Sequence, residues 1–116
     1  MLQLSGLSKS YNGKPALEDV TLTIANGTFV GVIGRSGAGK STLLRCINRL
    51  VNPTRGTIAI DNLDVTSLKG KALRDWRTSC GMIFQQFNLA GRLDVMTNVM
   101  MGRINSLGLF RSLLEL

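Results

Sequence analysis

The beginning of the chain alternates between apolar and polar residues. The alternation is loose over Leu2–Leu7 and strict over Val20–Ala25. Both segments predict short strands, the second with one face in water. Turn-forming residues occupy Ser8–Gly13, and the two pairs Asn12-Gly13 and Asn26-Gly27 are the strongest short signal for hairpin turns. The chain is therefore expected to begin with antiparallel strands.

Longer apolar segments follow, and their spacing changes between strand and helix. The predicted elements are a strand over Thr28–Ile33, a helix through Leu43–Val51, a strand over Thr57–Ile60, a helix over Leu68–Thr78, a strand over Gly81–Phe84 and a helix from Met96 to Ile104. Within residues 68–78, Leu73 and Trp76 share one helical face, and three basic residues can point to water: Lys71, Arg74 and Arg77. Strands that alternate with helices predict an α/β fold.

The most specific pattern reads Gly, four residues, Gly-Lys-Ser. A segment of strand length precedes it and a helical pattern follows, which is the context that a phosphate-binding loop requires. Backbone N–H groups that curl around a phosphate chain form an anion-binding nest, and glycine permits the curl. We therefore expect a nucleoside triphosphate to be bound by Gly34, Arg35, Ser36, Gly37, Ala38, Gly39, Lys40, Ser41 and Thr42.

Two side chains of this loop have distinct expected roles. Lys40 should reach the β and γ phosphates, and Ser41 should place its hydroxyl on Mg²⁺. The helix that starts there would point the positive end of its dipole at the ligand. The alternative is a flexible Gly/Ser loop without a ligand, and the flanking strand and helix argue against it.

The formal charge of +7 does not by itself indicate nucleic-acid binding. Lys and Arg are scattered along the sequence, and one Trp, one Tyr and four Phe are few residues for stacking on bases. A basic face in water, or a surface that meets an acidic partner or anionic headgroups, explains the excess about as well. No apolar run approaches the roughly 20 residues of a membrane span. A soluble or peripheral protein without direct nucleic-acid contact is expected.

Secretion is not expected either. The amino terminus has neither the basic region nor the apolar stretch of a signal peptide. Cys46 and Cys80 are isolated, without paired metal-ligand spacing, as is typical of reduced cysteines in a reducing compartment. These features predict a cytoplasmic location.

Three features in this order resemble the amino-terminal part of the ATPase subunit of an ATP-binding-cassette (ABC) transporter. They are Tyr11 in a turn, the Walker A loop at Gly34–Thr42, and Phe84-Gln85 at the end of a strand. The resemblance covers essentially the whole chain, and it implies that Tyr11 stacks on the adenine of ATP. It also implies that Gln85, the Q-loop residue, contacts Mg²⁺ and the attacking water, so that Gln85 and Lys40 are the candidate catalytic residues. Gln86 is the alternative Q-loop residue.

Each of these roles has a plainer alternative. Tyr11 could merely staple the hairpin, because amphipathic aromatic residues often cover strand ends. Gln85 could be an ordinary polar loop residue. The offsets of both residues from the Walker A loop favour the family roles.

The resemblance implies an α/β fold of the P-loop NTPase type, with an antiparallel β subdomain and an incomplete, mainly parallel core sheet with helices. Residues 1–116 would be the amino-terminal portion of one ATPase domain. The family completes its site with a Walker B Asp-Glu, a Leu-Ser-Gly-Gly signature and a switch histidine, and this sequence contains none of them. We therefore expect ATP binding without efficient hydrolysis. Such a truncated sheet predicts exposed apolar surface near Val30, Val32, Met82 and Ile83.

Within the family, the sequence is similar to the ATPase subunits of phosphonate importers. The similarity lies in Phe84–Leu89, Arg92–Val95, Thr97–Val99 and Phe110–Leu114. ATPases of polar amino acid and methionine importers share part of it and remain alternatives. The resemblance implies a peripheral location on the cytoplasmic face of the inner membrane, with membrane permease subunits and a second ATPase copy as partners and no contact with the solute. The permease footprint is expected within Phe87–Ile104.

Two other classes of function compete with this interpretation. One is a nucleotide-dependent binding module that holds ATP without hydrolysing it. The other is a different P-loop protein, such as a GTPase or a small kinase. The sequence has no Asn-Lys-x-Asp motif for reading guanine, and a GTPase would leave Tyr11 and Gln85 unexplained.

Overall fold

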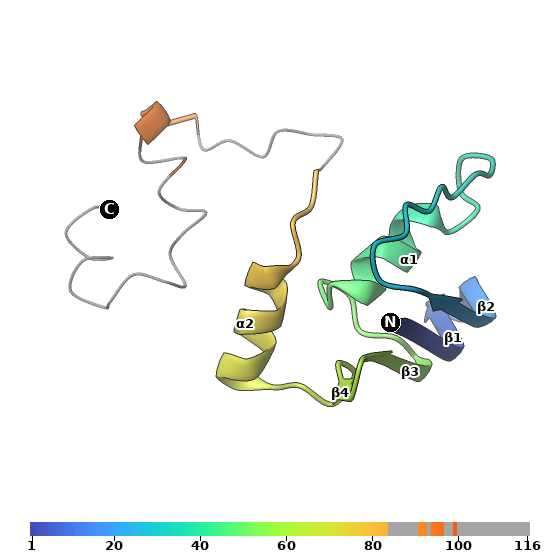
Figure 1. Cartoon of the computed structure of the whole chain (residues 1–116). Helices are drawn as coiled ribbons and strands as arrows, with labels where there is room; N and C mark the ends of the chain where they lie inside the picture. The colour runs from blue at the N-terminus through green and yellow to red at the C-terminus, as the bar shows by residue number, and fades with distance from the viewer. Residues whose placement is uncertain (84–90, 93, 97–98, 100–116) are drawn as a thin grey trace. The chain divides into compact units, whose positions relative to one another are not determined.

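The computed structural model describes residues 1–83, 91, 92, 94–96 and 99 (Figure 1). The chain divides into two compact units, Met1–Arg77 and Thr78–Leu116, and each is described by itself. The first unit contains the sheet, the glycine-rich loop and α1, while α2 (Gly70–Ser79) begins in the first unit and ends in the second. In the second unit, Met96 and Val99 are helical, as predicted, and Val95 before them is helical as well. The predicted helical residues Met100 and Ile104 lie outside the described residues.

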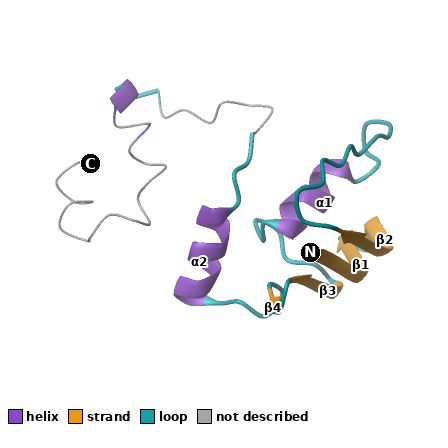
Figure 2. Cartoon of the chain, in the orientation of Figure 1, coloured by secondary structure: helices purple, strands orange, loops and turns teal. Residues whose placement is uncertain are grey.

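Four antiparallel strands form one sheet in the first unit (Figure 2). In spatial order they are β2 (Lys14–Ile24), β1 (Leu2–Tyr11), β3 (Arg55–Ile60) and β4 (Leu63–Asp64). The predicted antiparallel start and the predicted strand around residues 57–60 are confirmed. The prediction of a turn over residues 8–13 was too long, because β1 continues to Tyr11. Asn12 and Gly13 alone make the turn, both with the positive φ that a type I′ turn requires.

One face of the sheet is covered by α1 (Lys40–Ile47). The helix contributes Leu43 and Cys46, which lie about one turn apart and so point to the same side. Together with the strands they form one buried cluster of Leu4, Leu7, Leu17, Leu43, Cys46, Ile58 and Val65. The helix is shorter than the predicted span to Val51, because Arg49 has a φ of 60° and ends the helical conformation. This packing anchors the helix whose first residue is the Walker A lysine.

Gly56, the second residue of β3, lies against an irregular part of β1. Gly56 has a φ of 88°, and a Cβ atom there would clash with the carbonyl of Gly6 and lie 2.6 Å from the Cα of Leu7. The pairing of β1 with β3 shifts register between Ser5 and Ser8, at the point of this close approach. Only glycine fits both the backbone conformation and the space.

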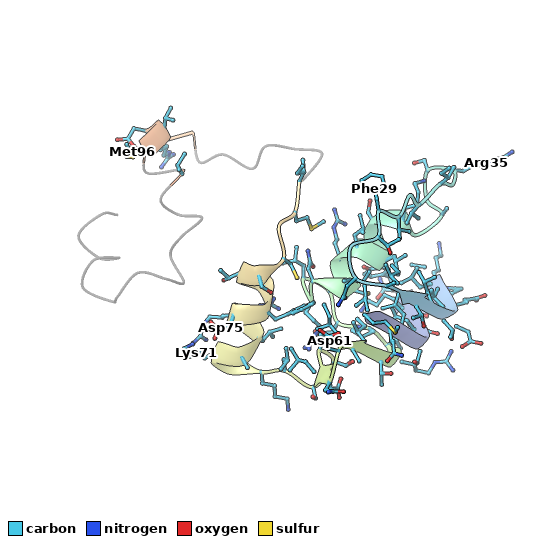
Figure 3. All side chains as sticks on the ribbon, in the orientation of Figure 1. Phe29, Arg35, Asp61, Lys71, Asp75 and Met96 are labelled. Carbon is cyan, nitrogen blue, oxygen red and sulfur yellow. The ribbon has the colours of Figure 1, made fainter. Side chains whose placement is uncertain are left out.

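α2 is amphipathic in the way the sequence predicts. Leu73 and Trp76 are its half-buried residues. The Trp76 indole N–H donates a hydrogen bond to the carbonyl of Ile47 at 3.0 Å, which ties α2 to the end of α1. On its exposed side, Lys71 and Asp75 form an ion pair at 2.7 Å, one helical turn apart (Figure 3).

Two predicted strands are not formed, and this corrects the expected parallel part of the sheet. Thr28–Ile33 is described and has no strand conformation, and neither do residues 81–83, while Phe84 lies outside the described residues. A strand is held by hydrogen bonds to its neighbours, and within the described ranges no strand pairs with either segment. The predicted apolar exposure is confirmed for Val30, Val32 and Ile83, whereas Met82 is half-buried.

No helix in the described part of the chain is long and apolar enough to cross a membrane.

Candidate functional site

The glycine-rich loop curls back on itself before α1 begins. Gly37 and Gly39 have φ angles of 83° and 92°, which lie in the left-handed region that glycine adopts without strain. The backbone N–H of Ala38 donates to the carbonyl of Arg35 at 3.0 Å, which closes a tight turn within the loop. The Arg35 side chain extends from the tip of this loop (Figure 3). The local sequence therefore produces the curl that the motif predicts.

The end of the loop rests on the β-hairpin. A Cβ atom on Gly39 would clash with the carbonyl oxygen of Ala16 and lie 3.2 Å from the Cδ2 atom of Leu17. Both of those residues belong to β2, and Leu17 is part of the buried core. Gly39 is thus required twice, for its backbone conformation and for its contact with β2. This contact fixes the start of α1 against the sheet.

Lys40 is the first residue of α1, and its side chain reaches back over the loop. Its ammonium donates to the carbonyl of Gly34 and, at 2.7 Å, to the carbonyl of Arg35. A Cβ atom on Gly34 would lie only 3.1 Å from the Cβ of Ala38 and 3.8 Å from the Lys40 Nζ. The two ends of the motif therefore meet, with the positive charge of Lys40 held at their junction.

Among the described residues, no side chain accepts a hydrogen bond at the amino-terminal cap of α1. Gly39 occupies the N-cap position, the first turn carries no acidic residue, and no side chain caps the helix. The first N–H groups of a helix have no partner within it, and they carry partial positive charge. Ser41 lies exposed in this turn, and Thr42 is half-buried beside it. A phosphate chain with a bound cation fits these groups, because they supply N–H donors, an ammonium and a hydroxyl.

Tyr11 lies at the end of β1, in the hairpin on which Gly39 rests. Its side chain is 43% exposed, and the Lys9 ammonium lies 5.0 Å from the centre of its ring. The Walker A residues and Tyr11 therefore all belong to the first unit. Gln85 and its alternative Gln86 lie outside the described residues, so their roles stay predictions.

Sequence reasoning missed a buried arginine next to the end of α1. Arg49 is 8% exposed, and its guanidinium donates to the carbonyls of Val65, Thr66 and Leu68 at 2.7, 2.9 and 3.4 Å. Arg77 is exposed, as predicted, and it also donates to the Arg49 carbonyl at 2.6 and 3.2 Å. In the sequence Arg49 is one of many scattered cations, and neither its burial nor its left-handed backbone conformation has a local sequence signal.

The described residues offer little chemistry outside the loop. Their His, Cys, Asp and Glu side chains form no group of three that could hold a metal ion. Burial raises the pKa of both thiols, with the Lys9 charge opposing that rise at Cys46 and a hydrogen bond with Ser79 opposing it at Cys80. A raised pKa keeps a thiol protonated and unreactive at neutral pH. The functional site is therefore the loop and its surroundings.

The chain is similar to several known proteins. The family model described as "ABC transporter" matches residues 17–113. The "Phosphonates import ATP-binding protein PhnC" of Bradyrhizobium diazoefficiens is 60% identical over 113 residues, which are 97% of this chain and 42% of that protein. The protein of the same name from Rhizobium meliloti is 58% identical over 105 residues, 90% of this chain and 38% of that protein.

Two solved structures of ABC cassettes have a fold similar to that of this chain. A dimeric bacterial ABC transporter cassette has a TM-score of 0.82 and 37% identity, over 93% of this chain and 49% of that one. A dimeric ATP-binding cassette in a post-hydrolysis state, bound to ADP and Pi, has a TM-score of 0.79 and 38% identity, over 90% and 47% of the two chains. The predicted P-loop fold of the ATP-binding-cassette type is confirmed. The chain spans about two fifths of the length of the curated relatives that it matches.

Proposed function

The chain belongs to the ABC transporter family, and we propose that it is the ATP-binding part of the ATPase subunit of an importer. Residues 1–116 are in this proposal the amino-terminal portion of one ATPase domain. ATP is the ligand, and its phosphates are bound by Gly34–Thr42. The energy of ATP then drives uptake of a solute through other subunits.

The observation that carries this proposal is the seating of the loop between β2 and α1. The Gly39 contact with Ala16 fixes the start of the helix, and the Lys40 ammonium lies over the curled backbone. Preorganised N–H donors and a fixed cation bind a phosphate chain with little reordering. On binding, the Lys40 ammonium would exchange the two carbonyls to which it now donates for the more negative phosphate oxygens.

Three further residues have assigned roles in the proposal. Ser41 places its exposed hydroxyl on Mg²⁺, which neutralises phosphate charge when it is bound. Tyr11 offers one ring face to the adenine. Gln85 contacts Mg²⁺ and orients the attacking water. The family resemblance supports the roles of Tyr11 and Gln85, and the exposure of Tyr11 also supports its stacking on the base.

We propose phosphonates as the transported solute class. The names of relatives at 53–60% identity support this choice over polar amino acids or methionine. The partners in the proposal are two membrane permease subunits and a second copy of the ATPase subunit, on the cytoplasmic face of the membrane. The dimeric state of the similar solved cassettes supports the second copy.

These 116 residues by themselves are proposed to hold ATP without sustained hydrolysis. Phosphoryl transfer needs a residue that orients water, and it needs charge stabilisation. The sequence has no histidine and no Asp-Glu pair after an apolar strand. Sustained turnover of Mg-ATP by the purified 116-residue chain, abolished by Lys40→Ala, would contradict this part of the proposal.

Calorimetric titration with Mg-ATP tests the binding site. Lys40→Ala removes a charge-assisted contact worth about 1.5–3 kcal/mol, so affinity should fall about 10- to 100-fold. Lys71→Ala, which removes a lysine from the exposed side of α2, is the matched control and should leave the affinity unchanged. Equal affinities of the Lys40→Ala variant and the unmodified protein would reject the proposed phosphate site.

Growth on a phosphonate as the phosphorus source tests the solute. A strain without the gene should fail to grow, the intact gene should restore growth, and the Lys40→Ala gene should not. Growth of the deletion strain on phosphonate, together with a lost uptake of methionine or a polar amino acid, would replace the solute and leave the ATP site intact.

A further inference from the structure

Lys9 is a half-buried cation whose ammonium lies over the ring of Tyr11. The distance from the Nζ to the ring centre is 5.0 Å. The two residues are two positions apart on β1, and alternate residues of a strand share a face. A cation within about 6 Å of a ring face is attracted by the negative charge of that face. Lys9 therefore restrains the ring and occupies one of its two faces.

The same lysine stands opposite the residue that supports the Walker A loop. Lys9 pairs with Leu17 of β2, and Leu17 is the side chain on which Gly39 rests. Its charge also acts on Cys46 in α1, where it opposes the rise in thiol pKa that burial causes. Lys9 thus lies close to the Tyr11 ring and also close to Leu17 and Cys46, which anchor the loop and α1.

We propose that Lys9 is a positioning residue for the nucleotide base, which it serves by holding one face of Tyr11 so that the other face receives the base. This inference rests on the proposed function, in which Tyr11 stacks on the base. An exposed ring at a hairpin end can rotate about its side-chain bonds, and ordering it on binding weakens affinity. Lys9 restrains the ring before the ligand arrives. The site is thereby preorganised at the base as well as at the phosphates.

A direct contact of Lys9 with the phosphates is the competing explanation, and the choice of ligand separates the two. ATP carries a base, whereas inorganic tripolyphosphate has three phosphates and no base. A residue that positions Tyr11 affects only ATP. A residue whose charge attracts phosphate affects both ligands, and more strongly at low salt.

The test is a titration of the full-length protein with Mg-ATP and with Mg-tripolyphosphate. Lys9→Met should weaken ATP binding about two- to fivefold, the size of an exposed cation–π contact, and should leave tripolyphosphate binding unchanged. Lys9→Arg keeps a cation over the ring and should restore ATP binding. Lys71→Met removes an exposed cation from α2, outside the hairpin, and any effect of it should be equal for the two ligands.

Tyr11→Ala separates failure of this inference from failure of the proposed function. If Tyr11→Ala weakens ATP binding and Lys9→Met does not, the inference about Lys9 is wrong and the base site stands. Equal weakening of both ligands by Lys9→Met also overturns the inference, in favour of a phosphate contact. If Tyr11→Ala has no effect on ATP, the base site itself is wrong. Thermal unfolding of each variant checks that the hairpin is intact.

Discussion

The sequence predicts a short strand both over residues 57–60 and over residues 28–33, yet only the first segment lies in a strand, β3. β3 pairs with β1 on one side and β4 on the other, and its Ile58 is fully buried. In the second segment Phe29 and Ile33 are 98% and 99% exposed, and the described residues supply no pairing strand. The Phe29 side chain extends from this segment (Figure 3). The difference teaches that an apolar, β-branched sequence favours a strand but forms one only where a neighbouring strand pairs with its backbone.

The largest expected effect comes from the same substitution in both segments. Ile58→Ala should reduce the free energy of unfolding by about 2–5 kcal/mol, because it leaves a cavity in the core. Ile33→Ala should change it by no more than about 0.5 kcal/mol, because the side chain contacts little. Urea unfolding followed by circular dichroism measures both. A loss at Ile33 as large as that at Ile58 would mean that residues 28–33 are covered in solution, and it would break the comparison.

Two glycines sharpen the comparison: Gly56, just before residues 57–60, and Gly27, just before residues 28–33. Gly56→Ala should lower the free energy of unfolding by about 1–2 kcal/mol for the left-handed backbone and by about 1–3 kcal/mol more for the clash with Gly6. Gly27 has a φ of 74°, and a Cβ atom there would have nothing within 4 Å, so Gly27→Ala should show the backbone term alone. The difference between the two midpoints of urea unfolding isolates the packing term. Equal losses would show that β1 and β3 do not approach so closely.

Local sequence information predicts the hairpin and the Walker A loop well for identifiable reasons. The Asn12-Gly13 turn and the curl at Gly37 and Gly39 depend on backbone angles that glycine and asparagine adopt at low energy. The spacing of Leu43 and Cys46 is a local property as well. Each of these features therefore follows from residues close together in the chain.

Features that depend on distant parts of the chain were not predictable in the same way. Residues 28–33 read as a strand, because the pattern cannot say whether a partner pairs with them. The burial of Arg49 depends on carbonyls at residues 65–68, and the contact of Gly39 depends on Ala16 in a separate strand. Lys9 looked like one of many surface cations until its distance to Tyr11 was known.

Two arginines extend the comparison to polar contacts. Arg49→Met removes the donors for the carbonyls of Val65 and Thr66, and should lower the free energy of unfolding by about 1–3 kcal/mol. Arg35→Met at the exposed tip of the Walker A loop is the matched control and should have little effect on stability. Differential scanning calorimetry measures both variants. A neutral effect of Arg49→Met would show that water replaces the guanidinium, which would contradict its burial.

The smallest expected effect lies at the exposed edge of the packed region, in β4. The pKa of Asp64 is lowered mainly by the Thr66 side chain and, to a lesser extent, by the Thr66 backbone N–H, which donates to the carboxylate at 3.0 Å. Unfolding releases these bonds, so the carboxylate stabilises the fold above its unfolded pKa near 3.8, and this contribution is lost as the pH falls through the lower folded pKa. NMR titration should place the midpoint of Asp64 ionisation below 3.8. Asp64→Asn should weaken the fall in the free energy of unfolding at acid pH. Glu18→Gln, which removes an exposed charge on β2, is the control. A midpoint at or above 3.8 would show that the turn after β4 is open in solution. In that case β3, and not β4, would be the last paired strand of the sheet.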